Sequence, residues 1–338
     1  MKARYCYISI WIVVPVLLTG MIFMGLTYGA TEISFDEVLS ILNPGNSNVP
    51  VPPVIRSVIL ELRLPRVLSG ILTGMGLALS GALLQTATRN DLADPFLFGL
   101  SSGASAGAVW VITRVGDQLG DWTLPVAAFT GGIISAITVT TLFIYHSHKG
   151  TSTLVITGIA VSFLFSALTS YLIFTGDQRA AGSILFWSLG GLGLARWDNL
   201  GLLLSGVVLM IVFIVVRWKD FDALLAGEQT AYSLGINVTR LRCEIFVCCA
   251  LTTSSLVALT GVIGFIGLMV PHMARIFSGV LHLRMLPLVA LLGAITLTGG
   301  DILSRTLTSP QELPLGIITG GMGGFFILLM LLRKNSNG

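Results

Sequence analysis

The residues of this chain that could hold a metal ion or form a disulfide are few. His146 and His148 lie together in a short polar loop, and the cysteines are Cys6, Cys243, Cys248 and Cys249. No two cysteines have the C-x-x-C spacing of a zinc or redox site, and all four lie in or beside apolar segments. We therefore expect buried thiols, solvated histidines and no metal site in this chain.

Groups that could drive transport are missing from the interiors of the apolar segments, which contain no Asp, Glu, Lys or Arg. Ion- and proton-coupled transporters generally need ionisable or unwound polar sites near the midplane, although Ser and Thr side chains leave sodium binding open. No glycine is followed by lysine, so the phosphate-binding loop G-x-x-x-x-G-K-[ST] is absent. If the chain moves a solute, the energy must come from another polypeptide. We expect no enzyme activity of its own.

The elements that position these residues are membrane spans. Of the 338 residues, 54% are hydrophobic and 10% are charged, whereas a soluble domain has about 25% charged residues. The net charge of +3 indicates no nucleic-acid partner. Because a span needs about 20 apolar residues, we expect an all-α polytopic membrane protein, a single domain over 1–338 with about ten helices. They lie near 8–28, 67–86, 96–113, 122–145, 153–176, 198–217, 242–260, 262–279, 285–303 and 313–333.

The charge distribution orients these spans. The apolar run 243–279 is too long for one crossing, so we divide it at Thr260–Gly261. An even number of spans puts both termini on one side, which then holds 12 of the 19 basic residues and all four lysines. The positive-inside rule places that side in the cytoplasm. The N-terminal apolar run covers about 20 residues, longer than a signal peptide's, and is expected to stay as the first span.

The segment 31–62 lies outside in this orientation and is long enough to fold. Ser34 and Glu37 have the spacing of a capping box, and Asn43-Pro44-Gly45 ends a short helix there, which we expect to lie on the membrane surface.

The segment 218–241 lies inside. Asp220 or Asp222 can cap a helix start and Gly235 suits its end. We expect a compact polar helix that is either a solvated connector or an element inserted into a cytoplasmic partner.

Glycines are spaced four apart in several spans, and this small-xxx-small pattern lets helix backbones approach closely. The positions are Gly70 and Gly74, then Gly99, Gly103 and Gly107, then Gly316, Gly320 and Gly324.

Six stretches of the sequence match the motifs of one transporter family. They are RLPR at 63–66, SGALLQ at 80–85, NDLADP at 90–95, GEQTAYSLG at 227–235, GFIGLMVPHMAR at 264–275 and ELPLGIIT at 312–319. Because these motifs occur in the order and spacing of one family, the chain resembles the FecCD family. These are the iron-siderophore and cobalamin importer permeases of type II ATP-binding-cassette importers.

The resemblance implies ten helices in each permease subunit and two permease subunits around one path. It also implies two ATPase subunits, which bind ATP and magnesium, and a periplasmic substrate-binding protein. No cofactor is implied for this chain itself. A sister heterodimer is slightly favoured over a homodimer.

The resemblance also implies three functional surfaces. The binding protein docks on Arg63, Arg66 and Arg305. The cytoplasmic gate uses Asn90, Leu92, Thr151 and Ser152. The ATPase-coupling surface in 218–241 is marked by Gly227, Glu228 and Gly235. The chain departs from the family pattern at Asp91, where proline is common, and so loses one turn restraint. It departs again at Gly320–Phe326, where the family commonly has Gly-Ala-Pro.

We therefore expect a permease subunit that carries a ferric siderophore across the bacterial inner membrane, with both termini in the cytoplasm. A haem or cobalamin importer permease of the same family is the alternative within this class. A secondary transporter working alone and a non-transporting membrane scaffold or enzyme are the alternatives from other classes.

Overall fold

The computed structural model describes residues 2–29, 31–43, 50–116, 120–145 and 152–335, and these residues form helices and loops without a strand. The long helices are α1 (Lys2–Thr27), α4 (Leu64–Thr88), α6 (Thr123–Tyr145), α7 (Ser152–Thr175), α9 (Trp197–Leu225), α11 (Val238–Thr260), α13 (His282–Thr306) and α14 (Leu315–Asn335). By length and apolar composition, eight helices of the described residues can cross a membrane.

Shorter elements connect these spans. They are α2 (Phe35–Leu42), α3 (Pro53–Ser57), α5 (Leu100–Trp110), α8 (Ala181–Leu189), α10 (Glu228–Ser233) and α12 (Ile266–Ser278). Single π-helical turns cover Val58–Arg63 and Val111–Val115, and 3₁₀ turns cover Pro95–Phe98, Gly120–Trp122 and Gln178–Ala180.

All ten predicted spans correspond to helices. Two of them, α5 and α12, have only 11 and 13 residues, so they are shorter than a full crossing of about 20. The predicted break is confirmed, because α11 ends at Thr260 and Gly261 follows with φ +64°. The capping box of Ser34 and Glu37 is confirmed at the start of α2.

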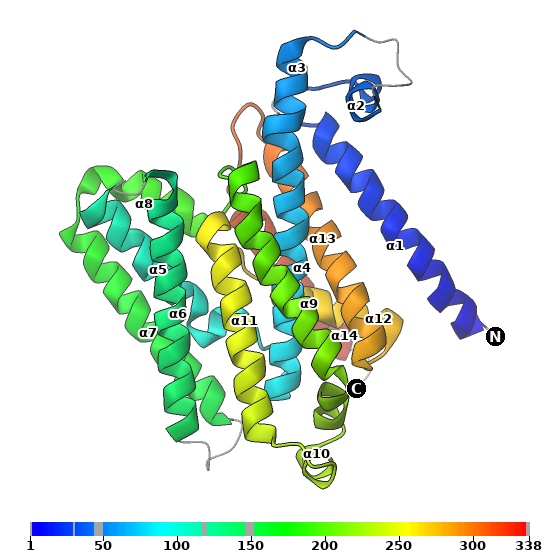
Figure 1. Cartoon of the computed structure of the whole chain (residues 1–338), viewed down its shortest axis with the longest axis vertical. Helices are drawn as coiled ribbons and strands as arrows, with labels where there is room; N and C mark the ends of the chain where they lie inside the picture. The colour runs from blue at the N-terminus through cyan, green and yellow to red at the C-terminus, as the bar shows by residue number, and fades with distance from the viewer. Residues whose placement is uncertain (1, 30, 44–49, 117–119, 146–151, 336–338) are drawn as a thin grey trace.

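Two predicted boundaries are wrong. The segment 53–62 is helical and continuous with α4, and the resulting 36-residue helix Pro53–Thr88 is about 54 Å long at 1.5 Å per residue. This exceeds the bilayer, and its α3 end projects above the bundle (Figure 1). Helix α9 runs on to Leu225, so Asp220 and Asp222 lie in its last turns and do not cap the start of α10.

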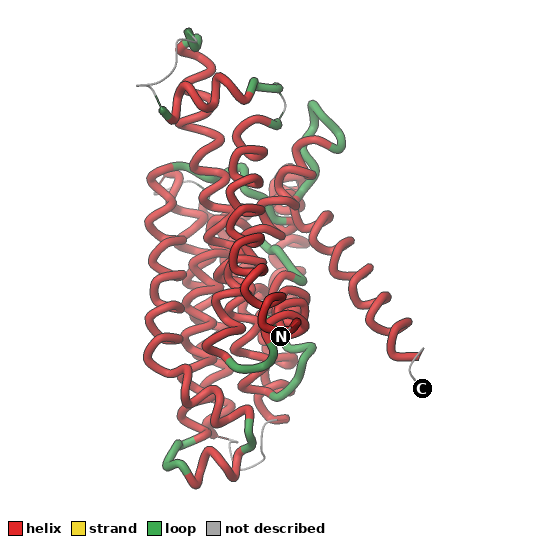
Figure 2. Tube along the Cα trace, turned by 90° about the vertical axis from the view of Figure 1, so that its right-hand side faces the viewer, coloured by secondary structure: helices red, strands yellow, loops and turns green. Residues whose placement is uncertain are grey.

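Helices α4 and α11 are central and mostly buried, whereas α1, α7 and α14 lie at the periphery. Helix α1 leans away from the bundle in Figure 1, and α14 does so in Figure 2. The protruding α3 and the small helix α10 mark opposite ends of the molecule, named here the α3 end and the α10 end (Figure 1).

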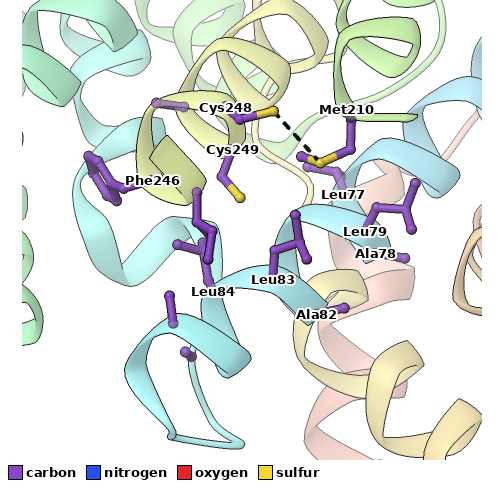
Figure 3. Close-up of a cluster of buried hydrophobic side chains, with 14 of the residues drawn as sticks. Leu77, Ala78, Leu79, Ala82, Leu83, Leu84, Met210, Phe246, Cys248 and Cys249 are labelled. Atoms are coloured by element: carbon purple, nitrogen blue, oxygen red, sulfur yellow. Dashed lines mark hydrogen bonds between the residues drawn. The ribbon is translucent and has the colours of Figure 1, made fainter. Parts of the chain in front are cut away.

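Backbone-to-backbone contacts hold α4 in the centre. Gly74 lies against Gly293 of α13, and Gly81 lies against Gly267 of α12, so closely that a Cβ at either α4 position would overlap the facing backbone. The predicted glycine packing is likewise found at Gly103, against α6. Around these contacts, leucines of α4 form a continuous apolar core with α9 and α11 (Figure 3).

The cysteines with described side chains are free thiols. Cys248 and Cys249 are buried, as predicted, and Cys243 is half-buried. The Sγ of Cys248 on α11 lies 4.0 Å from the Sδ of Met210 on α9 (Figure 3). His146 and His148 lie outside the described residues.

Candidate functional site at the α10 end of α4

The loop that follows α4 is short and tightly folded by its own side chains. Arg89 ends the helix with a left-handed backbone, φ 51°. The Oδ1 of Asn90 accepts a hydrogen bond from the Leu92 amide at 3.0 Å, and the Ala93 amide donates to the Asn90 carbonyl at 3.1 Å. Asn90 and Leu92, two of the predicted gate residues, therefore form an exposed tip at the α10 end.

Gln85 holds three of the recognised motifs together. Its buried Nε2 lies within hydrogen-bond reach of the carbonyls of Ala93, Gly267 and Leu268, at 3.4, 3.2 and 3.4 Å. The side chain thus connects the end of α4 with the loop after it and with the start of α12. We did not single out Gln85 from the sequence, although it closes the SGALLQ motif.

Asp94 is a buried carboxylate in this loop. Its Oδ1 accepts the Phe96 amide at 2.9 Å and caps the 3₁₀ turn, whereas Oδ2 has no hydrogen-bond partner among the described residues. Burial raises the pKa of Asp94 to about 6, against the lowering effect of the Phe96 hydrogen bond. Desolvation dominates because one carboxylate oxygen receives no compensating donor.

Asp91 forms an ion pair in the position where the related family commonly has proline. Its Oδ1 lies 2.8 Å from Nη1 of Arg275, near the end of α12. The side chain of Asp91 is 75% exposed, so the pair is a weak tether rather than a rigid restraint.

Arg242 of α11 connects this region to α10. Its buried guanidinium donates from Nε to the Ala87 carbonyl at 2.9 Å and from Nη2 to Oε1 of Glu228 at 2.7 Å. Ala87 lies in the last turn of α4, and Glu228 is the first residue of α10. One planar side chain therefore joins the predicted coupling helix to α4, which leads into the predicted gate loop.

His282 makes a second connection of the same kind. Its Nδ1 and its backbone nitrogen lie 2.7 and 2.9 Å from Oδ1 of Asp222, and its Nε2 lies 2.8 Å from the Thr86 hydroxyl. Asp222 therefore caps the start of α13 from the last turns of α9. Through its contact with Thr86, the Asp222–His282 pair also connects the end of α9, which leads to α10, to the last turn of α4.

The predicted end of the helix in 218–241 is confirmed at Gly235, whereas its predicted start is wrong, because α10 begins at Glu228. Gly227 (φ 127°) precedes α10, and Gly235 (φ 80°) follows its last residues, as expected for a helix stop. Ala231 is buried against the protein, whereas Tyr232 and Leu234 are 55% and 65% exposed. Helix α10 thus presents an uncovered apolar surface at this end of the molecule.

Thr151 lies outside the described residues. Ser152 begins α7, and nothing is described of its side chain.

The three arginines predicted to dock a binding protein lie together at the α3 end, where each is bonded within the chain. Arg63 is buried and donates to the carbonyls of Leu26 and Thr27, both at 2.7 Å, and to that of Thr31. Arg63 therefore holds the end of α1 against α4.

Asp301 of α13 lies between the other two arginines, Arg66 and Arg305. Arg66 contacts its Oδ1 at 2.9 Å and also contacts Glu312, while Arg305 contacts its Oδ2 at 3.0 Å. Arg66 is partly exposed, and Arg63 and Arg305 are covered. The docking role stays a prediction, and for Arg63 and Arg305 it requires α1 to uncover them.

Comparisons with known proteins place this arrangement in a family. The profile of the FecCD transport family matches residues 17–333. The chain belongs to the FecCD transport family. Its members are permease subunits of ABC importers, which work with ATPases and substrate-binding proteins, and this chain is accordingly a multi-pass membrane permease.

Individual relatives cover most of the chain. The cobalamin import permease BtuC of Halobacterium salinarum is 37% identical over 83% of this chain and 75% of its own length. The Fe(3+) dicitrate permease FecC of Escherichia coli is 33% identical over 91% of each chain. A solved metal-chelate type ABC transporter in an inward-facing conformation has a TM-score of 0.84 at 27% identity, covering 96% of this chain and 99% of the other.

Proposed function

We propose that this FecCD permease imports a ferric siderophore across the bacterial inner membrane, driven by separate ATPase subunits that bind ATP and magnesium. One observation carries the mechanistic part of the proposal. Arg242 joins the first residue of α10 to the last turn of α4, just before the loop at Asn90–Asp94. A displacement of α10 by a partner would reach the loop through rigid contacts rather than through a flexible linker.

The direction of this coupling follows from the two ends of the molecule. The α10 end faces the cytoplasm in the proposal, so α10 lies on the ATPase and both termini are cytoplasmic. The α3 end faces the binding protein. When the ATPases close, they move α10. Arg242 and His282 pass this movement to the end of α4, and the loop tip at Asn90 and Leu92 then opens or closes the exit.

The cargo class is supported by a cavity at the α3 end. It has a volume of about 660 Å³ and is lined by the aromatic rings of Phe186 and Trp187 and by the charged pair of Arg66 and Glu312. Such a mixed surface suits a large organic chelate better than a bare hydrated ion. Relatives named for ferric dicitrate and for cobalamin carry cargo of this kind, so haem and cobalamin are the competing cargoes.

Reconstitution tests this function. The chain is co-purified with its ATPase, its second permease subunit and its binding protein, and uptake of a radiolabelled ferric hydroxamate into proteoliposomes is measured. We expect ATP-dependent uptake that excess haem or cobalamin does not compete away. Preferred uptake of haem or cobalamin would overturn the cargo assignment. Uptake by the chain alone, driven by an ion gradient, would overturn the ABC mechanism in favour of a secondary transporter.

A further inference from the structure

A second cavity lies at the α10 end, between α9 and α11, and none of the roles above uses it. It has a volume of about 950 Å³. One wall is a stripe of α9 that includes Leu209, Phe213 and Val216, and the facing wall is a stripe of α11 that includes Val247 and Leu251. We name this cavity the α9–α11 groove. Figure 1 shows the two helices side by side along it.

Helices α9 and α11 meet at both ends of the groove, by backbone packing at one end and by a side-chain ion pair at the other. Above it, Gly206 of α9 lies against Ser255 of α11, and the Thr252 hydroxyl donates to the Gly206 carbonyl at 3.0 Å. At the opposite end, the helices are bridged by side chains, with Arg217 and Glu244 paired at 2.5 Å. A groove closed at both ends by contacts between α9 and α11 does not suit a further helix packed along it, whose diameter is about 10–12 Å.

The length of the groove matches one leaflet of a membrane. Its lining runs from Leu209 to Asp220 on α9 and from Arg240 to Leu251 on α11. Each stretch rises about 17 Å at 1.5 Å per residue, close to half of the roughly 30 Å hydrocarbon thickness. The adjoining surface of α9 is also apolar and exposed, with Val212 and Val215 at 55% and 66%. The groove is therefore open to the acyl chains that surround the helix.

Polarity along the groove changes in the way a phospholipid requires. The half near Gly206 is lined by apolar side chains and the Cys248 thiol, whereas the half near α10 holds Arg217, Asp220, Arg240 and Glu244. Arg217 bonds to both acids. Arg240 contacts Glu244 only through Nε at 2.9 Å and is 77% exposed. Its two terminal amino groups have no acceptor among the described residues, and they can donate to a phosphate.

We propose that the α9–α11 groove binds one phospholipid of the leaflet on the α10 side, with an acyl chain between Phe213 and Val247 and the phosphodiester on Arg240. Water does not fill the apolar half of the groove stably, because the walls there offer it too few polar partners. The phosphodiester is common to zwitterionic and anionic phospholipids, and the four charged side chains sum to zero, so headgroup charge is not the selecting feature.

The bound lipid also contacts the chain that returns from α10. Gly235, Ile236 and Asn237 line the groove, and they connect α10 to α11. A phospholipid there braces α10 against α9. This consequence rests on the proposed function, whereas lipid binding itself does not.

Photolabelling of the full chain tests the site. The chain is placed in nanodiscs of phosphatidylethanolamine and phosphatidylglycerol that contain a trace of phosphatidylglycerol with a diazirine in its acyl chain. Labelled residues are mapped by mass spectrometry. We expect labelling at Phe213 and Val247 several-fold above that at Val212, which faces bulk lipid. Equal labelling at these positions, or crosslinks of the groove to a protein subunit in the assembled importer, would overturn the proposal.

Two pairs of variants separate the site from general lipid contact. Val247→Trp fills the groove and should remove most labelling of Phe213, whereas Val212→Trp, on the outer face of α9, should leave it. Arg240→Gln should lower retention of phospholipid in native mass spectrometry by about fivefold, the effect of one cationic contact near the surface, and Lys219→Gln should not. Arg240 is exposed, so its replacement does not endanger the fold. Unchanged retention in Arg240→Gln contradicts the phosphate site.

Discussion

Asp94 makes the stability of the loop after α4 depend on pH. Its pKa rises from 3.8 to about 6 on burial, so between these values the folded state binds more protons than the unfolded state. The free energy of unfolding therefore falls as the pH rises from about 4 to about 6 and is constant above. Asp94→Asn keeps a cap oxygen and cannot ionise. At pH 7 it should stabilise the chain by up to about 3 kcal/mol.

Thermal unfolding in detergent at several pH values measures this. The variant should lose the pH dependence between about 4 and 6. Asp198→Asn, an exposed acid on α9, should keep it. A stabilisation of Asp94→Asn that is equal at pH 4 and pH 7 would show that ionisation of Asp94 is not its cause.

Arg242 is the residue whose loss should separate ATP hydrolysis from transport. Arg242→Lys keeps the charge, but a single ammonium cannot reach Ala87 and Glu228 as the planar guanidinium does. Loss of one charge-assisted hydrogen bond changes an equilibrium constant by about tenfold. Cargo uptake per ATP hydrolysed should therefore fall by about that factor while ATP hydrolysis continues. Lys219→Arg on the exposed face of α9 is the control. Parallel loss of hydrolysis and uptake would assign Arg242 a purely structural role.

At the scale of elements, the sequence predicts where the chain crosses the membrane better than where helices end. Apolar runs place every predicted span on a helix, because burial in lipid or core depends on local composition. The end of α9 was mispredicted because its last turns are polar. Asp222 is held there by His282, 60 residues later in the chain. Gln85, Arg242 and Asp222 were missed as site residues for the same reason, since their partners are distant in sequence.

The contact between α4 and α12 depends on two facing glycines. In Gly81→Ala the new Cβ overlaps the backbone of Gly267, which cannot rotate away as a side chain could. The helices must separate, and we expect destabilisation of about 1–3 kcal/mol or more. Gly201→Ala on α9 meets no atom within 4 Å and serves as the matched control. Thermal unfolding of both in detergent checks this, and equal midpoints would contradict close packing of α4 on α12.

At the scale of the whole molecule, α4 is held at three levels. Near the α3 end, Arg66 pairs with Asp301 of α13. In the middle, glycine contacts join it to α12 and α13, and at the α10 end Arg242 and His282 bind its last turn. Packed elements linked in this way move as rigid bodies. An alternating-access motion should therefore carry α4, α12 and α13 together and move them against the exposed helices.

We expect helix α14 to contact the second permease subunit. Gly320 and Gly324 have the small-xxx-small spacing predicted from sequence, yet a Cβ at either position meets no atom of this chain within 4 Å. Close approach of a helix from another subunit would use that space, because small residues let membrane helices pack backbone to backbone. Gly320→Leu should then weaken the pairing, while Gly201→Leu on the lipid-facing side of α9 should not.

Co-purification measures this pairing. The chain is expressed with a second, differently tagged copy and with a sister permease, and each partner retained after affinity capture is quantified. We expect capture of the sister permease in preference to the second copy, and loss of that capture in Gly320→Leu. Because the glycines face away from their own chain, the variant should keep its unfolding temperature. Intact pairing in a folded Gly320→Leu protein would place lipid, and not the second permease, on this face of α14.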